Sequence, residues 1–350
     1  MLHARNKVDP ALHGLAVDPL KVVADELKGL SKNIRQLLGS GHPILDTVAK
    51  YYTQSEGKHV RPLLVLLMSR ATALTPRTAP TNQSLDRSIS PAQILSDINP
   101  DIPQASLTDP PPVVPSSSDI LPSQCRLAEI TELIHTASLL HDDVIDNSTT
   151  RRSSPSANLE FGNKMAVLAG DFLLGRASVA LARLRNPEVT ELLATVIANL
   201  IEGEFMQLQN TAENEKRPKY SPKIFDYYLQ KTYLKSASLI SKSCRAAAIL
   251  GGCEQEAVDA AYSYGRNLGL AFQLVDDMLD YTVSADELGK PANADLQLGL
   301  ATAPLLFAWR EHPQLGELVG RKFAEPADIE KVSRSHARTD TTMKLTSAGT

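Results

Sequence analysis

Apolar residues recur at intervals of three and four positions along most of the chain, which places them on one face of a helix. A period of two, typical of a half-buried strand, is absent. Asp18 is a candidate N-cap for the first helix. The pattern predicts an all-α bundle. The expected helices cover 18–38, a stretch from 44, 62–73, 125–147, 164–185, 187–211, 222–250, 254–281 and 298–310.

Composition divides the chain into four segments. Residues 1–75 form N-terminal helices, and 124–323 form a helical bundle. Between them, 76–123 holds 10 of the 22 prolines and many serines, so we expect a disordered insertion. The tail, 324–350, is polar with little apolar periodicity, and we expect it to be disordered.

The segment LLHDDVIDNSTTRR, residues 139–152, closes an apolar run with three carboxylates. On a helix, Asp142 and Asp146 share a face, and Asp143 flanks them. Carboxylates on one face repel one another, and a hard divalent cation that prefers oxygen ligands relieves that repulsion. The guanidinium forks of Arg151 and Arg152 suit the oxygens of a phosphate. A single DDxxD is more often a solvated helix face than a metal site.

A second copy of the motif changes that balance. The stretch FQLVDDMLDY repeats the spacing with Asp276, Asp277 and Asp280, again among apolar residues. Two copies on separate helices are able to face each other across a cavity and hold several metal ions around one diphosphate. The pair therefore indicates metal-assisted chemistry on a diphosphate.

Six motifs in order carry a resemblance to a known family: GKHVRP, IHTASLLHDDVID, the Arg151–Arg152 pair, QKT, FQLVDDMLD and GKPANADLQLG. From about residue 18 to 323 the chain resembles the trans-polyprenyl diphosphate synthases, most closely the hexaprenyl type that makes ubiquinone side chains in fungi. The resemblance implies a class I isoprenoid synthase bundle with a central cavity, two to three Mg2+ ions and a homodimer.

The resemblance also implies roles for individual residues. Asp142, Asp146, Asp276 and Asp280 would hold magnesium, supported by Asp143 and Asp277. The allylic diphosphate would contact Arg151, Lys231, Thr232, Gln273 and Lys290. Isopentenyl diphosphate would contact Lys58, Arg61, His135 and Arg152. Taken alone, Lys58 and Arg61 are also an ordinary loop charge pair, and His135 a structural core histidine. Ser153 stands where the family usually has glycine.

The implied reaction is the head-to-tail condensation of isopentenyl diphosphate with dimethylallyl, geranyl or farnesyl diphosphate. An allylic diphosphate ionises, the double bond of isopentenyl diphosphate attacks the cation, and a proton is lost. Two alternatives are a class I terpene cyclase and a non-catalytic subunit of a heteromeric synthase. The intact second DDxxD, the basic motif for a second substrate and the retained acidic residues argue against both.

Product length stays open at this stage. Ala137 and Ser138 lie one turn before Asp142, and small residues there leave a deep tunnel for a long product in the family. The tail and the lack of a recognisable import sequence instead suggest a relocated copy that makes geranyl or farnesyl diphosphate for a secondary metabolite.

Charge and cysteines bear on partners and location. A net charge of −4 gives no indication of nucleic-acid binding. The three cysteines form no paired framework, which indicates reduced thiols. No apolar run reaches the ~18 residues of a membrane span. The N-terminus lacks the Arg- and Ser-rich character of a transit peptide. We therefore expect a cytosolic protein without a transmembrane segment, and a mitochondrial one only if the N-terminus is incomplete.

Overall fold

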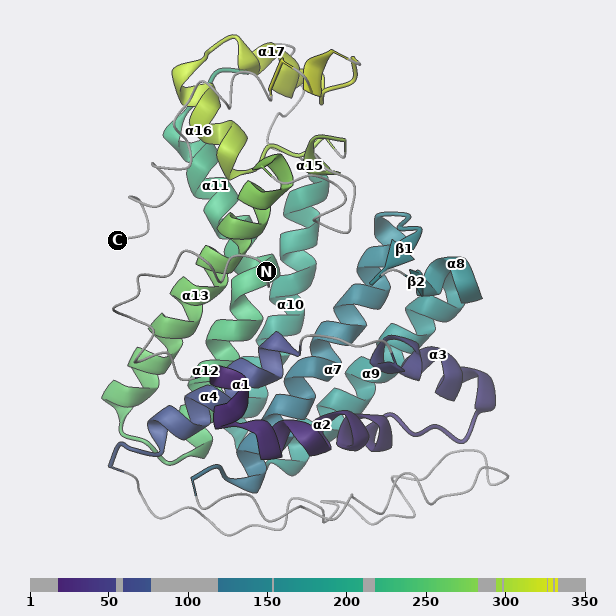
Figure 1. Ribbon diagram of the computed structural model, residues 1–350, viewed down its shortest axis with the longest axis vertical. Helices are drawn as coiled ribbons and strands as arrows, with labels where there is room; N and C mark the ends of the chain where they lie inside the picture. The colour runs from purple at the N-terminus through teal and green to yellow at the C-terminus, as the bar shows by residue number, and fades with distance from the viewer. Residues whose placement is uncertain are drawn as a thin grey trace.

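The computed structural model describes residues 18–54, 59–76, 119–152, 154–209, 218–282, 294–297, 299–325, 327–329, 331 and 332. Over these residues the chain is mostly helical, which confirms the predicted all-α fold (Figure 1). The helices are α1 Pro19–Val22, α2 Ala24–Leu37, α3 Pro43–Gln54, α4 Val60–Thr72, α7 Pro122–Ile145, α8 Ala157–Phe161, α9 Asn163–Arg183, α10 Pro187–Gln209, α11 Pro222–Thr232, α12 Ser238–Leu250, α13 Gln255–Thr282, α15 Ala294–Gln297, α16 Ala303–Glu311 and α17 Leu315–Gly320.

Helix α7 lies at the centre of the main hydrophobic core. It packs against α9, α4 and α12. Its residues Ile130, Leu133 and Ile134 are completely buried. A helix that is apolar around most of its circumference needs neighbours on several sides, and α7 has them. The acidic turn of α7 is therefore held on a rigid support.

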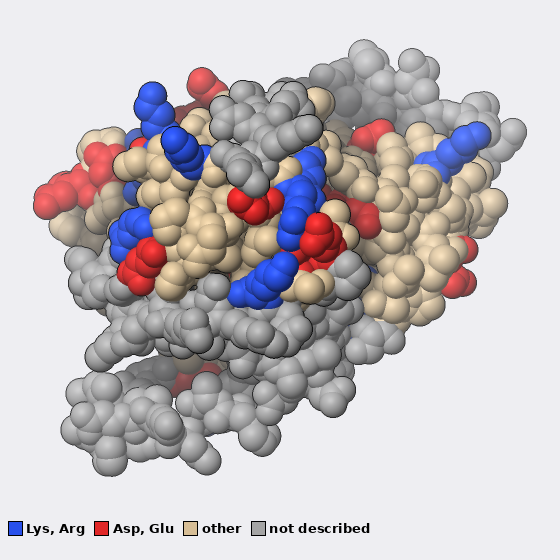
Figure 2. Space-filling model, turned by 90° about the horizontal axis from the view of Figure 1, so that it is seen from above, with Lys and Arg blue, Asp and Glu red and all other residues tan. Residues whose placement is uncertain are grey.

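The helices after α7 run up and down beside it, so the carboxyl ends of α7, α10 and α13 lie at the same end of the bundle (Figure 1). Both aspartate motifs are at carboxyl ends, in α7 and α13. Figure 2 looks onto this end of the molecule, where basic and acidic side chains lie side by side among uncharged ones. The up-and-down path thus brings together two motifs that are far apart in sequence.

A π-helical turn, η3 Tyr233–Ala237, joins α11 to α12. It is packed closely on two sides. A Cβ added to Gly269 of α13 would lie 2.7 Å from Cα of Ala237, and one added to Gly203 of α10 would lie 3.0 Å from the backbone nitrogen of Lys235. Glycine at these two positions permits the close approach. π turns of this kind are frequent at functional sites.

A second hydrophobic cluster joins α11, α16 and α17 around Trp309 and Tyr228. It includes Val332, which is completely buried. Nearby, Arg321 Nη2 lies 2.5 Å from Oδ1 of the buried Asp328. The first part of the expected tail therefore contacts the bundle, whereas 333–350 lies outside the described residues. Most of the expected insertion, 77–118, also lies outside them, but its last residues are ordered, since Ile120 is buried in the main core and α7 begins at Pro122.

Several local features differ from the sequence-based expectation. Asp18 caps α1 as predicted, since its Oδ1 accepts a hydrogen bond from Leu20 N at 3.1 Å, but the expected helix 18–38 is interrupted at Val23. The segment expected to be helical from 298 begins as α16 only at Ala303. A short hairpin, β1 Thr150–Arg151 and β2 Ser154–Pro155, was missed because two-residue strands are too short to show a period.

Helix α9 is long enough and apolar enough to cross a membrane, which corrects the expectation that no such stretch exists. Length and composition are weak evidence by themselves, because core helices of soluble proteins also meet these criteria. In this fold α9 packs against α7, α3, α8 and α10. We therefore describe it as a bundle helix.

Candidate active site

The first aspartate motif occupies the last turn of α7. Burial raises the pKa of Asp142 to about 6, and the carboxylates of Glu204 and Asp146 add to this rise against the opposing charge of Lys235. Burial also raises the pKa of Asp146, again with Glu204 adding to it. These carboxylates lack full compensation by protein cations. The structure therefore brings Asp142 and Asp146 together, as predicted.

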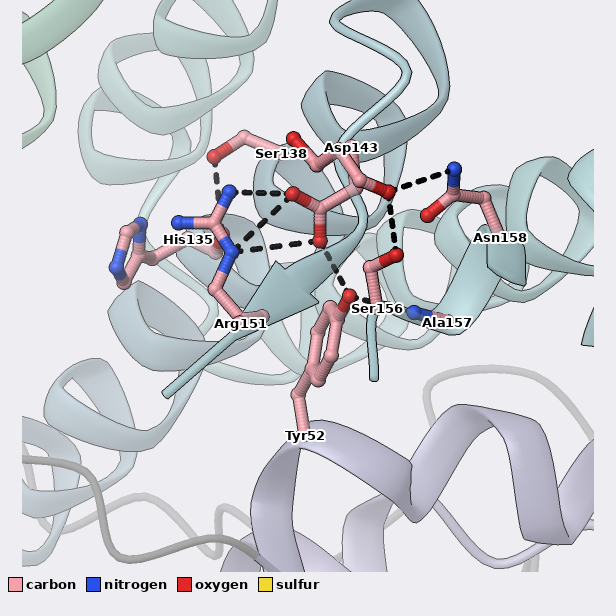
Figure 3. A network of polar contacts seen from close by, with 9 residues as sticks. Tyr52, His135, Ser138, Asp143, Arg151, Ser156, Ala157 and Asn158 are labelled. Atoms are coloured by element: carbon pink, nitrogen blue, oxygen red, sulfur yellow. Dashed lines mark hydrogen bonds and ion pairs between the residues drawn. The ribbon is translucent and has the colours of Figure 1, made fainter. Parts of the chain in front are cut away.

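Asp143, the middle residue of the motif, has a different environment (Figure 3). It is completely buried. Arg151 Nη2 donates to Asp143 Oδ1 at 2.5 Å, and the Tyr52 hydroxyl donates to Oδ2. Burial opposes the charge of Arg151, but the hydrogen bond to Asp143 raises the pKa of Arg151 overall. Asp143 therefore holds Arg151 beside the motif.

In the second motif, on α13, two of the three carboxylates are buried. Asp277 is buried, and it accepts hydrogen bonds from the Tyr228 hydroxyl at 2.6 Å and from Gln273 Nε2 at 2.8 Å. Burial raises its pKa. Asp280 is buried and accepts a hydrogen bond from the backbone nitrogen of Asp295 at 3.2 Å. Asp276 is partly exposed. Of the three, Asp276 is therefore the most accessible to a cation.

Two lysines lie between the motifs, and sequence analysis identified only one of them. Lys231 is subject to the charges of Asp277 and Glu204, although burial lowers its pKa overall. Lys235, in the π turn, forms an ion pair with Glu204. Its positive charge also opposes the rise in the pKa values of Asp142 and Asp146. Both Lys235 and Glu204 were missed. The position of Lys235 four residues after Lys231 is the signal that could have indicated it.

The remaining residues of the predicted allylic site are placed as follows. Gln273 Oε1 accepts a hydrogen bond from Ser236 Oγ at 2.7 Å, so its amide links the π turn to Asp277. Thr232 is buried and hydrogen-bonded to the Tyr228 hydroxyl. Its contact is therefore with a residue that supports Asp277. Lys290 lies outside the described residues.

A separate cavity of about 360 Å³ is lined by basic groups and by apolar side chains of α12 and α13. The basic groups are His59, Arg61, His135 and Arg152. Arg61 Nη1 lies 2.8 Å from Nε2 of His135. Burial, with the charge of Arg61, lowers the pKa of His135 well below its ordinary range. His135 is thus neutral, with Nε2 accepting from Arg61 and the proton on Nδ1.

This cavity gathers three of the four residues expected to contact isopentenyl diphosphate: Arg61, His135 and Arg152. The fourth, Lys58, lies outside the described residues, as does Ser153. Glu132 also lines the cavity, and its Oε1 lies 3.2 Å from His59 Nδ1. Two cationic guanidinium groups in a partly apolar cavity suit a diphosphate.

The residues predicted to set product length lie on α7, before the aspartates. Ala137 is completely buried. Ser138 is partly buried, and its hydroxyl donates to the backbone oxygen of His135 at 2.9 Å. Both side chains are small, as the prediction of a long product requires.

The carboxylates fit a hard divalent cation. Partial desolvation and the neighbouring carboxylates raise the pKa values of Asp142 and Asp146, and a cation would relieve that repulsion. Among the described residues, no three acidic, histidine or cysteine side chains converge on one point. Each ion would therefore complete its coordination with water and diphosphate oxygens, as magnesium does.

These features define a class: an all-α protein with two carboxylate motifs and two groups of basic side chains beside them. Comparison with known proteins agrees. The polyprenyl synthetase family model matches residues 42–335. A probable mitochondrial hexaprenyl pyrophosphate synthase from Neurospora crassa is 69% identical over 338 residues, covering 93% of this chain and 74% of that protein. The mitochondrial hexaprenyl pyrophosphate synthase of Saccharomyces cerevisiae is 50% identical, with 90% and 80% covered.

Solved structures support the same fold. A decaprenyl diphosphate synthase from Rhodobacter capsulatus gives a TM-score of 0.71 at 28% identity, covering 95% of this chain and 88% of that one. A Caulobacter crescentus polyprenyl synthase, complexed with calcium and isoprenyl diphosphate, gives 0.72 at 27%, covering 95% and 87%. This chain belongs to the polyprenyl synthetase family. It is a prenyltransferase, a prenyl diphosphate synthase.

The comparisons overturn one expectation. The similar proteins from Neurospora crassa, Yarrowia lipolytica and Saccharomyces cerevisiae are all named as mitochondrial. The prediction of a cytosolic location is therefore wrong. It relied on the composition of the first residues, which is a poor guide to location compared with 50–69% identity over most of the chain.

Proposed function

We propose that this enzyme makes a long trans-prenyl diphosphate of the hexaprenyl class, in mitochondria, for a ubiquinone side chain. The observation that carries the product length is that two small residues, Ala137 and Ser138, precede the acidic turn of α7, where bulky side chains would stop the growing chain early. The similar proteins from Neurospora crassa and Saccharomyces cerevisiae are named as a probable hexaprenyl pyrophosphate synthase and a hexaprenyl pyrophosphate synthase, respectively, which supports the same product. Geranyl or farnesyl diphosphate would instead require a bulky side chain near this position.

Magnesium, held by Asp142, Asp146, Asp276 and Asp280 together with diphosphate oxygens, would neutralise the charge that develops on the leaving diphosphate. Arg151, Lys231 and Lys235 would bind the same diphosphate from the protein side. Gln273 would orient its amide toward this site through Ser236 and Asp277. As the carbon–oxygen bond of the allylic diphosphate breaks, the positive charges of Arg151, Lys231 and Lys235 would stabilise the diphosphate anion that leaves.

The second substrate, isopentenyl diphosphate, would occupy the cavity lined by Arg61, His135 and Arg152. Neutral His135 would donate its Nδ1 proton to a diphosphate oxygen. The double bond would then attack the allylic carbon, a carbon–carbon bond would form, and the departed diphosphate would accept a proton from the former isopentenyl unit. Leu268, Phe272 and Ile240 line the same cavity and would exclude water from the cation.

We also propose a homodimer formed by α9 and α10. Large apolar side chains are exposed along one face of each helix, and on α10 they follow one another at the spacing of successive turns. They are Met165, Leu168 and Val179 on α9, and Ile201, Phe205 and Leu208 on α10. A two-fold axis would bury this self-complementary face.

The domain division stays part of this proposal. Residues 1–75 would supply the GKHVRP motif, 124–323 both carboxylate motifs, and 76–123 and 324–350 would be additions to this catalytic unit.

One experiment tests the proposed function. The purified protein is incubated with Mg2+, isopentenyl diphosphate and each of dimethylallyl, geranyl and farnesyl diphosphate, and the products are sized by mass spectrometry. We expect chains of about six isoprene units from the allylic starters. Products that stop at ten or fifteen carbons would contradict the long-chain assignment. Cyclised hydrocarbons would contradict chain elongation.

A further inference from the structure

Tyr52 on α3 contacts the first aspartate motif but has no role in the proposed reaction. Its side chain is buried, and its hydroxyl donates to Asp143 Oδ2 while it accepts a hydrogen bond from the backbone nitrogen of Ala157 at 2.8 Å (Figure 3). The acceptor contact directs the single hydroxyl proton toward the carboxylate. Tyr52 therefore links α3, the last turn of α7 and the start of α8.

The same carboxylate holds Arg151. Arg151 Nη2 lies 2.5 Å from Asp143 Oδ1, and Nε lies 3.2 Å from Oδ1 and 3.3 Å from Oδ2. These bonds use one edge of the guanidinium and leave Nη1 outside the pair. Because Asp143 has no exposed surface, all of its lone pairs face protein groups and none faces solvent. Asp143 is thus held by hydrogen bonds between Tyr52 and Arg151, and it orients the guanidinium group of Arg151.

We propose that Tyr52 is a positioning residue for the allylic diphosphate site, acting through Asp143 to fix the direction of Arg151. This inference rests on the proposed contact between Arg151 and the allylic diphosphate. A buried carboxylate with one oxygen left short of a donor rotates or recruits water, and the guanidinium bonded to it moves with it. The middle aspartate of the first motif consequently serves orientation, and metal binding falls to Asp142 and Asp146.

Tyr52→Phe isolates the hydroxyl, because the ring and the backbone stay. The backbone oxygen of Tyr52, which accepts from Arg152 Nη1 at 3.4 Å, is also retained. The isopentenyl side of the site should therefore be unaffected. Loss of one hydrogen bond to a charged group should raise KM for farnesyl diphosphate about tenfold.

Tyr51→Phe is the matched control. The Tyr51 hydroxyl donates to the backbone oxygen of Pro155 at 3.0 Å, in the same hairpin, and its ring packs edge-on against Phe161 at 5.1 Å. It makes no bond to Asp143. Tyr51→Phe thus removes a hydroxyl that supports the hairpin, without touching the carboxylate that holds Arg151.

The experiment measures kcat and separate KM values for farnesyl and isopentenyl diphosphates in the wild type, Tyr52→Phe, Tyr51→Phe, Arg151→Gln and the Tyr52→Phe/Arg151→Gln double variant. We expect a selective rise in KM for farnesyl diphosphate in Tyr52→Phe, none in Tyr51→Phe, and a double variant no worse than Arg151→Gln. Equal rises in both KM values, the same effect in Tyr51→Phe, or additive effects in the double variant would overturn the proposal.

Two further variants separate the possible failures. If Arg151→Gln leaves KM for farnesyl diphosphate unchanged, the proposed contact of Arg151 fails, and the role of Tyr52 fails with it. Asp143→Asn should reproduce the selective KM effect while the Mg2+ concentration for half-maximal activity stays unchanged. A shift in that Mg2+ concentration comparable to that of Asp142→Asn would make Asp143 a metal ligand and overturn the proposal, whether or not Tyr52→Phe folds.

Discussion

Lys235 Nζ lies 2.6 Å from Glu204 Oε2, and this ion pair stands beside the first aspartate motif. Glu204 is largely buried, and within the described residues its Oε1 has no hydrogen-bond partner. The π turn supplies the lysine, and α10 supplies the carboxylate. Glu204 raises and Lys235 lowers the pKa values of Asp142 and Asp146. The ion pair thus influences the net charge around Asp142 and Asp146, where a cation and a diphosphate would bind.

Lys235→Met should lower turnover about a hundredfold and also lower Tm, because it leaves the buried Glu204 carboxylate without its cation. Adding Glu204→Gln should recover Tm but not turnover. Lys242→Met is the control: this α12 lysine donates to Thr195 at 2.7 Å, away from the aspartates. Turnover and thermal unfolding are measured on all variants. Recovery of turnover in the double variant would contradict a role for Lys235 in the reaction.

Asp142→Ala and Asp276→Ala should each lower turnover by about three orders of magnitude, because both remove a proposed metal ligand. The helical circular dichroism signal should stay near that of the wild type. Asp259→Ala, on the same helix as Asp276 but paired with Arg245 at 2.5 Å, is the control and should keep its activity. Turnover near that of the wild type in either test variant would exclude the proposed mechanism.

The raised pKa of Asp142 predicts how the stability of the metal-free protein depends on pH. In the metal-free protein its pKa is about 6, above its ordinary value, so the folded state binds the proton more tightly than the unfolded state. The stability it contributes is present at low pH and is lost as pH rises through about 6. Asp142→Asn should therefore raise the Tm of the metal-free protein at pH 7.5 by a few degrees, and by less at pH 5.

Asp259 is the control for this pH effect, because its pKa is lowered whereas the pKa of Asp142 is raised. A hydrogen bond from Arg245 lowers the pKa of Asp259, so its stabilising contribution is present at both pH values. Asp259→Asn should lower Tm at pH 5 and at pH 7.5 alike. Differential scanning calorimetry with excess chelator makes both measurements. An Asp142→Asn difference that is the same at the two pH values would be inconsistent with the raised pKa.

The proposed dimer face predicts a response to added charge. Phe205→Glu should convert the protein to a monomer at micromolar concentration, because Phe205 is 62% exposed on α10 within the apolar face. Ile44→Glu, 56% exposed on α3, is the matched control and should leave the mass unchanged. Light scattering measures both. A wild-type protein that is a monomer and fully active would refute the dimer.

Ala137→Phe should shorten the product by one or more isoprene units, since a phenyl ring at this position would block the path proposed for the growing chain. Ala137→Val adds less volume and should give an intermediate distribution. Products are sized by chromatography after equal consumption of isopentenyl diphosphate, which separates product length from lost activity. An unchanged product length in Ala137→Phe with normal turnover would show that the chain grows elsewhere.

The sequence by itself determined the helices, the class of fold and the identity of the two carboxylate motifs. These depend on local spacing: residues four apart share a helix face whatever the rest of the chain does, so Asp142 with Asp146, and Asp276 with Asp280, were predictable. The basic pair after the first motif was identified from its position next to the carboxylates and from the match between guanidinium groups and phosphate oxygens. The family resemblance then supplied Arg61, His135 and Arg152, which do line one cavity.

Only the tertiary structure decided what each of these groups contacts. Asp143 receives its hydroxyl donor from Tyr52, 91 residues away in sequence, and no local pattern encodes that pairing. The ion pair between Lys235 in the π turn and Glu204 on α10 likewise joins two elements that are separate in sequence. Helix spacing acts within one element, whereas partners, burial and pKa values arise where distant elements meet.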